Sequence, residues 1–185
     1  MFNERLRMSK KYVLLLRAVN VGGRNLIKMA NLRHAFEEHG FLNVKTYIQS
    51  GNVVFEVNNK FHLLLKQKVA TILKENFDYE LAFVLIDFEI FLRILDTIPA
   101  SYTKLTEHKK IFVSFLAEKP LEENIIKLHS FSNDNENYLV NGTVVYVWCL
   151  KDGRKLNFSN KWIERLLQVS ATTRNLNTVK RLATY

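Results

Sequence analysis

The stretch RAVNVGGRN, residues 17–25, holds two adjacent glycines, two arginines and two asparagines directly after an apolar run at residues 12–16. Successive glycines allow positive φ angles that turn backbone N–H groups into a concavity suited to an anion. The arginines add positive charge, while the asparagine amides either hydrogen-bond a ligand or cap the loop's own turns. This composition predicts a site for a negatively charged group.

The predicted ligand-binding residues lie in the segment 17–28 and in a hairpin that follows it. They are Arg17, Asn20, Gly22, Gly23, Arg24, Asn25, Lys28, Gln49 and Asn52. The stretch lacks the GxxxxGK[ST] and GxGxxG spacings of nucleotide-binding loops, so a long loop with solvated arginines is the competing interpretation. Ser50 lies in the same hairpin. We interpret it as a turn residue because no acid–base partner accompanies it.

A second block, TTRN at residues 172–175, precedes a C-terminal stretch with helical apolar spacing. We expect Thr172, Thr173 and Asn175 to cap that helix, which places Arg174 at its start. A cation there opposes the helix dipole unless an anion is shared between the side chain and the free N–H groups. Thr173, Arg174 and Asn175 therefore form a second predicted anion-binding group, which we expect to converge in space with the VGGRN loop.

The formal charge of +9 is concentrated at both ends of the 185-residue chain. Residues 1–60 carry a balance of +6 and residues 136–185 one of +5, whereas residues 61–135 carry −2. This asymmetry favours an anionic partner at a surface built from both ends, although a solvated basic face without a partner has the same signature.

Several classes of site find no support in the sequence. The lone Cys149 lies in the apolar run VVYVWCL, which predicts a buried and inert thiol. The histidines lack metal-ligand spacing, and no metal site is predicted from His34, His39, His62, His108 and His129. No apolar run reaches the roughly 20 residues of a membrane helix, and no secretion signal opens the chain, so we expect a cytoplasmic protein.

Apolar periodicity predicts strands near residues 11–17, 44–49, 52–57, 79–86, 110–116, 136–141 and 143–149. Helical patterns fill the gaps, with Gly40 as a helix end and Asp87 as a helix cap. The order is βαββαβ in the first half and begins in the same way in the second. We therefore predict an α+β fold of two ferredoxin-like halves with mainly antiparallel sheets.

An internal duplication relates the halves. YIQSGNVVF at residues 47–55 matches YLVNGTVVY at residues 138–146, and KYVLLLR matches KIFVSFL, which places Gly51 and Gly142 in equivalent turns. Asn141-Gly142 suits the centre of a type I′ turn. The first half has eight extra residues between its aligned segments, and we assign them to the VGGRN loop, since loops that exceed geometric need commonly carry function. The predicted domains are residues 1–98 and 110–185, joined by a linker at 99–109.

The segment from LLRAVNVGGRN to SGNVVF and the terminal TTRNLNTVKRL resemble the signature blocks of DUF1697, a bacterial family of unknown function. That family usually has Gly-Ile where this chain has Ala18-Val19. The resemblance implies an α+β fold with two ferredoxin-like halves. It implies no activity, cofactor or catalytic residue.

Three functions fit these features. The first is binding of a small anionic ligand, a phosphate-bearing metabolite or nucleotide, with group transfer or hydrolysis left open. The second is a nucleic-acid-binding module, which the basic charge and Phe55 on a central strand favour, although that strand lacks the base-stacking pattern of RNA-recognition sheets. The third is a regulatory or assembly module without catalysis.

Overall fold

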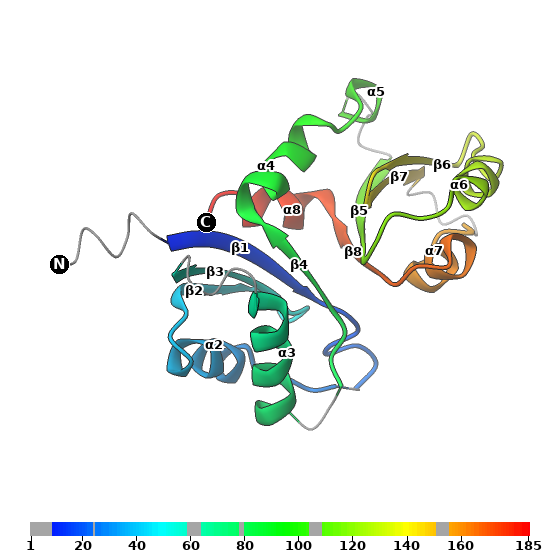
Figure 1. Ribbon diagram of the computed structural model, residues 1–185. Helices are drawn as coiled ribbons and strands as arrows, with labels where there is room; N and C mark the ends of the chain where they lie inside the picture. Colours follow the sequence, from blue (N-terminus) through cyan, green and yellow to red (C-terminus); the bar gives the residue numbers. More distant parts are fainter. Residues whose placement is uncertain (1–8, 24, 59–63, 78–79, 104–108, 151–155) are drawn as a thin grey trace. The chain divides into compact units, whose positions relative to one another are not determined.

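The computed structural model describes residues 9–23, 25–58, 64–77, 80–103, 109–150 and 156–185 (Figure 1). It contains two compact units. The first comprises the chain up to Leu92 together with Leu182–Tyr185, and the second comprises Arg93–Arg181. None of the helices in these described ranges is long and apolar enough to cross a bilayer.

The first unit is built on one four-stranded antiparallel sheet. Its elements in chain order are β1 (Ser9–Leu16), α2 (Met29–Glu38), β2 (Leu42–Tyr47), β3 (Asn52–Asn58), α3 (Leu65–Asn76) and β4 (Phe83–Asp87), followed by α4 (Phe88–Asp96). The strand order is β2-β3-β1-β4, with every neighbouring pair antiparallel. This is the split βαβ arrangement predicted for the first half.

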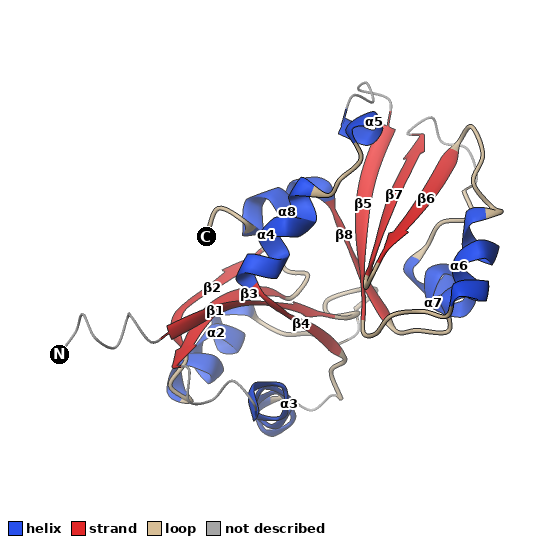
Figure 2. Ribbon diagram, turned by 45° about the horizontal axis from the view of Figure 1, so that its top comes forward, coloured by secondary structure: helices blue, strands red, loops and turns tan. Residues whose placement is uncertain are grey.

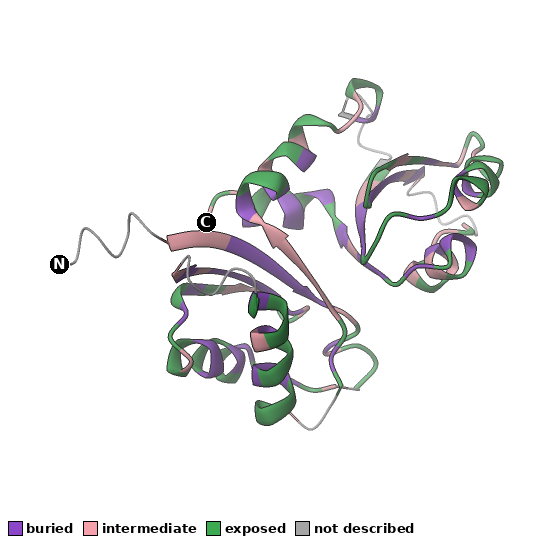
Figure 3. Ribbon diagram, viewed as in Figure 1, coloured by how far each residue is buried: buried purple, intermediate pink, exposed green. Residues whose placement is uncertain are grey.

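Helices α2 and α3 cover one face of this sheet (Figure 1). The core on that face centres on aromatic rings, with Phe55 of β3 lying 5.4 Å from Phe36 and 4.8 Å from Phe41 between ring centroids. The other face is buried as well, since Val13 and Leu15 of β1 are 0% exposed (Figure 3). A strand buried on both faces has a continuous apolar sequence, as the segment YVLLL of β1 does.

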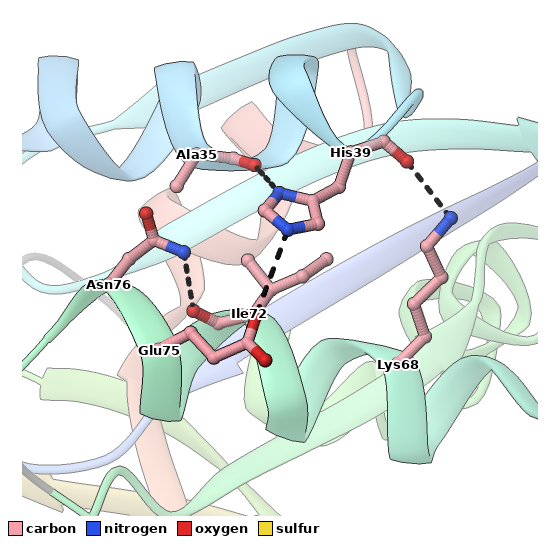
Figure 4. A network of polar contacts seen from close by, with 6 residues as sticks. All are labelled: Ala35, His39, Lys68, Ile72, Glu75 and Asn76. Atoms are coloured by element: carbon pink, nitrogen blue, oxygen red, sulfur yellow. Dashed lines mark hydrogen bonds and ion pairs between the residues drawn. The ribbon is translucent and has the colours of Figure 1, made fainter.

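A set of polar contacts joins the end of α2 to α3 (Figure 4). The Nζ of Lys68 donates to the backbone carbonyl of His39 at 2.9 Å. The His39 ring lies with Nδ1 2.7 Å from the carbonyl of Ala35 and Nε2 3.9 Å from the carboxylate of Glu75. These contacts fix the spacing of the two helices over the sheet.

Two helix boundaries agree with the sequence signals. Gly40 follows α2 with a φ of 79°, and its N–H donates to the carbonyl of Glu37 at 3.0 Å, which is a helix-ending arrangement suited to glycine. The carboxylate of Asp87 accepts the N–H of Glu89 at 2.9 Å, so Asp87 caps α4.

The second unit repeats the arrangement. Its elements are α5 (Ala100–Thr103), β5 (Lys109–Leu116), α6 (Glu122–His129), β6 (Glu136–Asn141), β7 (Val144–Leu150), α7 (Asn160–Leu167), β8 (Ala171–Asn175) and α8 (Leu176–Leu182). The order β6-β7-β5-β8 matches that of the first sheet, with all pairs antiparallel. Helices α6 and α7 lie on one face (Figure 2) and enclose a core with Leu116, Val145 and Val147. The α+β prediction of two ferredoxin-like halves is confirmed.

Residues 99–109, predicted as a linker, include the short helix α5. Residues 104–108 of that stretch lie outside the described residues.

The helix expected after TTRN is present as α8, but the placement of Thr172, Thr173 and Arg174 at its start is wrong. Residues 171–175 form strand β8, which pairs with β5 from Phe112↔Asn175 to Leu116↔Ala171, and α8 begins only at Leu176. β-Branched threonines favour a strand, but the partner strand lies about sixty residues away in the sequence, so local patterns do not reveal the pairing. Of the predicted caps, Asn175 caps α8 by accepting the N–H of Thr178 at 2.8 Å.

The predicted turn at Asn141-Gly142 is also wrong by one residue. Asn141 is the last residue of β6 and pairs with Val144, so Gly142 and Thr143 form the two-residue loop. Gly142 has a φ of 59°, as expected, but it occupies the first central position, which is the pattern of a type II′ turn. In the first unit four residues, 48–51, separate β2 from β3, and Gly51 is the last of them. The two glycines are therefore not equivalent.

The duplication holds at the level of the sheets, whereas the residue alignment shifts by one. The N–H of Leu16 donates to Gly51 in the first unit, and the N–H of Leu116 donates to Thr143 in the second, both at 2.8 Å. As a result Phe55 faces α2 and α3, while its aligned partner Tyr146 lies on the face opposite to Val145 and Val147. The extra residues of the first half are located as predicted, since residues 17–28 join β1 to α2 and only residues 117–121 join β5 to α6.

Candidate ligand site beside the first sheet

The loop at residues 17–28 is anchored at both limbs and exposed at its tip. Val19 and Ile27 are buried at 2% and 3% exposure. Between them Val21, Gly22 and Gly23 are exposed. The predicted ligand residue Arg24 lies outside the described residues. The loop therefore has a fixed base and presents its glycine pair to solvent.

Asn20 closes the base of the loop. Its backbone N–H donates to Asn25 at 3.1 Å, its Oδ1 accepts the N–H of Ile27 at 2.8 Å, and its Nδ2 donates to the Ile27 carbonyl at 2.9 Å. The Nδ2 of Asn25 donates to the carbonyl of Ala18 at 3.1 Å. Of the two roles predicted for these asparagines, capping the loop's own turns is the one that the geometry displays.

The same side chain joins the loop to the hairpin between β2 and β3. The Nδ2 of Asn20 donates to the Gln49 carbonyl at 2.7 Å. A Cβ added at Gly51 would lie 2.6 Å from Leu16 Cβ and 2.7 Å from Val19 Cγ2, so only glycine permits this approach. Residues 17–28 and 48–51 thus form one continuous surface, here named the loop–turn edge.

Positive φ angles are concentrated at the loop–turn edge, at Ala18 (53°), Asn20 (54°), Gly22 (59°), Gly23 (74°), Asn25 (50°), Ile48 (47°) and Gly51 (71°). Glycine and asparagine tolerate this conformation, whereas alanine and β-branched isoleucine are strained in it. Strained backbone of this kind clusters at functional sites because surrounding contacts must hold it in place. Residues 117–121, the corresponding loop of the second unit, include no positive φ.

The tip of the loop is open. A Cβ at Gly22 or Gly23 would meet no heavy atom within 4 Å, and among the described residues no acceptor is bonded to either N–H. The side chain of Lys28 at the end of the loop is exposed, and Arg17 at its start is half-buried. Free N–H groups on positive-φ glycines beside cationic side chains are chemically suited to phosphate or carboxylate.

The two predicted hairpin residues differ in position. Gln49 is exposed on the turn. Asn52 is 0% exposed, and its Nδ2 donates to the Tyr47 carbonyl at 3.0 Å and to the Ser50 hydroxyl at 2.9 Å. Asn52 therefore supports the turn from beneath, and Ser50 takes part in the turn as expected.

The predicted residues of the C-terminal block lie in β8 of the second unit. Thr173 Oγ1 donates to Asn160 Oδ1 at 2.8 Å and lies 2.8 Å from the hydroxyl of Ser114. Arg174 is 9% exposed, with Nη1 donating to the hydroxyl of Thr172 at 3.1 Å and the carbonyl of Thr173 at 2.9 Å. Burial lowers the pKa of Arg174 to about 10, which leaves the guanidinium protonated at neutral pH. The convergence of this block with the VGGRN loop stays a prediction.

The family described as "Protein of unknown function (DUF1697)" matches residues 9–146, which include the loop–turn edge and helices α2 and α3. The chain belongs to the DUF1697 family. The terminal TTRN block lies beyond the matched residues.

A solved structure has the same fold. It is described as a conserved bacterial protein, SP0830 from Streptococcus pneumoniae, with 26% identity and a TM-score of 0.69 over 95% of this chain and 98% of that one. No curated protein matches the chain. The similarity thus establishes family and fold and assigns no activity.

The second unit of this DUF1697 protein contains a buried polar cluster that is not apparent from the sequence. The carboxylate of Glu136, 2% exposed, accepts the backbone N–H of Asn157 at 3.0 Å, the Asn157 Nδ2 at 2.6 Å and the Phe158 N–H at 3.2 Å. Cys149 pairs with Glu136 across the strands, and burial raises the pKa of its thiol. The thiol is buried as predicted. The signal in the sequence is a carboxylate, Glu136, at the start of a predicted strand. Its hydrogen-bond donors, Asn157 and Phe158, come near it only when the chain folds.

No group of three or more His, Cys, Asp or Glu side chains able to hold a metal occurs within the described ranges. His62 and His108 lie outside those ranges.

Proposed function

We propose that this DUF1697 protein binds a small anionic, phosphate-bearing ligand at the loop–turn edge. The observation that supports this most directly is the pair Gly22-Gly23, two exposed residues with positive φ whose N–H groups bond no acceptor among the described residues, on a loop anchored at its base. In the proposal these N–H groups contact the anion, with Lys28 and Arg24 adding positive charge. Asn20, Asn25 and Asn52 position the loop and turn without contacting the ligand.

The difference between the two units supports the location. Both units connect their first strand and first helix over the same type of sheet, but the second does so with residues 117–121 alone. The longer loop of the first unit, with its strained residues, therefore exceeds what the connection requires. The hydrogen bonds that hold the loop in place also favour affinity, because a loop that is already ordered loses little conformational entropy when a ligand binds.

The proposal uses the loop–turn edge alone. Thr173 and Asn175 are hydrogen-bonded inside the second unit, to Asn160 and Thr178 respectively. A ligand could contact Thr173 and Asn175 only by displacing those hydrogen bonds, so these two residues are not among the proposed ligand contacts.

Nucleic-acid binding is less well supported. Base stacking on a ferredoxin-like sheet needs exposed aromatic side chains on the central strands. Phe55, which favours that function at the level of sequence, is 0% exposed and packs under α2. The basic charge remains compatible with either class of anion.

The test is a calorimetric titration of the full chain with inorganic phosphate and with pyrophosphate, which measures the affinity for each. Lys28→Gln should weaken binding about three- to ten-fold, as expected for loss of one charge-assisted contact at a partly solvated site. Lys119→Gln removes an exposed lysine from the shorter loop of the second unit and serves as the matched control, with unchanged affinity expected. Absence of binding by the unmodified protein, or equal losses in both variants, would contradict the proposal.

A further inference from the structure

The loop–turn edge carries three exposed aliphatic side chains. Val21 is 63% exposed, Leu26 66% and Ile48 51%. Single exposed apolar residues are normal on a protein surface, but a group of them beside an anion-binding loop adds a second kind of contact to the site.

The three side chains belong to segments that Asn20 holds together. Val21 directly follows Asn20 in the chain. Leu26 lies between Asn25 and Ile27, which bond to Asn20 at 3.1 Å and 2.8 Å. Ile48 precedes Gln49, whose carbonyl accepts from Asn20 at 2.7 Å. The three aliphatic residues therefore belong to segments that are joined at Asn20.

Ile48 is in a conformation that its side chain disfavours. Its φ is 47°, in the left-handed region where a β-branched residue is strained. Asparagine or glycine would occupy the same turn position without this strain. The side chain is half exposed, so burial in the core does not explain an isoleucine there. A contact with a ligand would.

We infer that the ligand is a phosphate ester with an apolar or aromatic body, bound with its phosphate at Gly22-Gly23 and its body on Val21, Leu26 and Ile48. The inference rests on the proposed anion site and specifies the chemical class of the ligand that the site binds. Inorganic phosphate fills only the polar half of such a site. An ester with a planar ring fills both halves, because ring faces pack on aliphatic side chains and remove apolar surface from water.

Phenyl phosphate and inorganic phosphate are the two probes. The unmodified protein should bind phenyl phosphate at least about ten-fold more tightly, since burial of one ring face against three aliphatic side chains contributes at that level after binding costs. Ile48→Asn should remove most of this difference while leaving the affinity for inorganic phosphate unchanged. The same variant should unfold at a higher temperature, because asparagine relieves the positive-φ strain.

Ile126→Asn provides the matched control. Ile126 lies on α6 of the second unit and is 64% exposed, so its substitution removes an exposed isoleucine that belongs to neither the loop nor the turn. It should change the affinity for neither probe. Equal binding of the two probes by the unmodified protein, with phosphate still bound, would overturn this inference and leave the anion site standing. Loss of the ring preference in the control, or its persistence in Ile48→Asn, would also overturn it. Binding of neither probe would remove both proposals.

Discussion

Gly51→Ala tests how the hairpin and the loop are held together. The Gly51 carbonyl accepts the N–H of Leu16 at 2.8 Å, and its Cα lies against the buried side chains of Leu16 and Val19. An alanine Cβ would stand 2.6 Å from Leu16 Cβ and 2.7 Å from Val19 Cγ2, distances that real contacts do not reach. One of these atoms belongs to the stem of a fully buried strand residue, so it cannot move aside.

Two costs add at this position. The φ of 71° places alanine in the left-handed region, which costs roughly 1 kcal/mol relative to glycine. The overlap with two buried side chains is an overpacking that costs roughly 1 to 3 kcal/mol more. Together they predict a loss of about 2 to 4 kcal/mol in the free energy of unfolding.

Gly142→Ala separates the two costs. Gly142 has a φ of 59°, but a Cβ there would meet nothing within 4 Å. This variant should therefore lose only the conformational cost, about 1 kcal/mol. Urea unfolding of both variants, with the m-values compared to exclude a change in the denatured state, measures the difference. Losses of equal size in the two variants would refute the steric reasoning at Gly51.

Three further predictions concern single residues, and each is measured as a change in the free energy of unfolding. Ala18→Gly should stabilise the protein by up to about 1 kcal/mol, because Ala18 has a φ of 53°, whereas Ala117→Gly in the other loop, where φ is not positive, should be neutral or destabilising. Tyr146→Phe should destabilise the protein by about 1 kcal/mol, because the buried Tyr146 hydroxyl donates to the Ile94 carbonyl at 2.8 Å and lies 2.6 Å from the Thr97 hydroxyl, and an unchanged free energy of unfolding would contradict this assignment. Asn20→Ala should cost roughly 2 to 3 kcal/mol by leaving the Ile27 N–H without its side-chain acceptor and releasing the loop from Gln49, so a loss under about 0.5 kcal/mol would show that the loop is held by other contacts.

Apolar periodicity was sufficient to predict most of the fold. Seven of the strands were predicted, the central ones from apolar runs such as KYVLLL and VVYVW, and the edge strands β2 and β6 from shorter segments beside the two hairpin turns. Strand β8 does not follow from such a run. Its residues Ala171–Asn175 are mostly polar, and they form a strand because β5 offers a free edge on which Ser114 and Thr173 hydrogen-bond across the pair. That pairing is a tertiary contact, and local propensity carries little information about it.

The position of the long loop was predictable from the sequence, whereas the roles of its residues were less so. The excess length of the VGGRN loop is visible in the sequence because the second half supplies a shorter counterpart. The different roles of the asparagines cannot be seen in the sequence. Asn20 and Asn52 have the same side chain, and only the fold shows that one closes the loop and the other supports the turn. The strain at Ile48 is equally invisible, since isoleucine in a sequence favours extended structure.

Comparison of the two units supports the proposed location of the ligand site in the first unit. In the first sheet both faces of the central strands are closed, with Val13 and Leu15 fully buried on one side and Phe55 on the other, so the faces offer no binding surface. The second unit shows that a sheet of the same order forms with the unstrained residues 117–121 in place of a long loop. The strain at Ala18 and Ile48, roughly 1 to 3 kcal/mol per residue, is therefore not a requirement of the fold, and it is held in place by the hydrogen bonds of Asn20. An edge that holds strain while exposing glycine N–H groups and aliphatic side chains is therefore suited to contact a ligand.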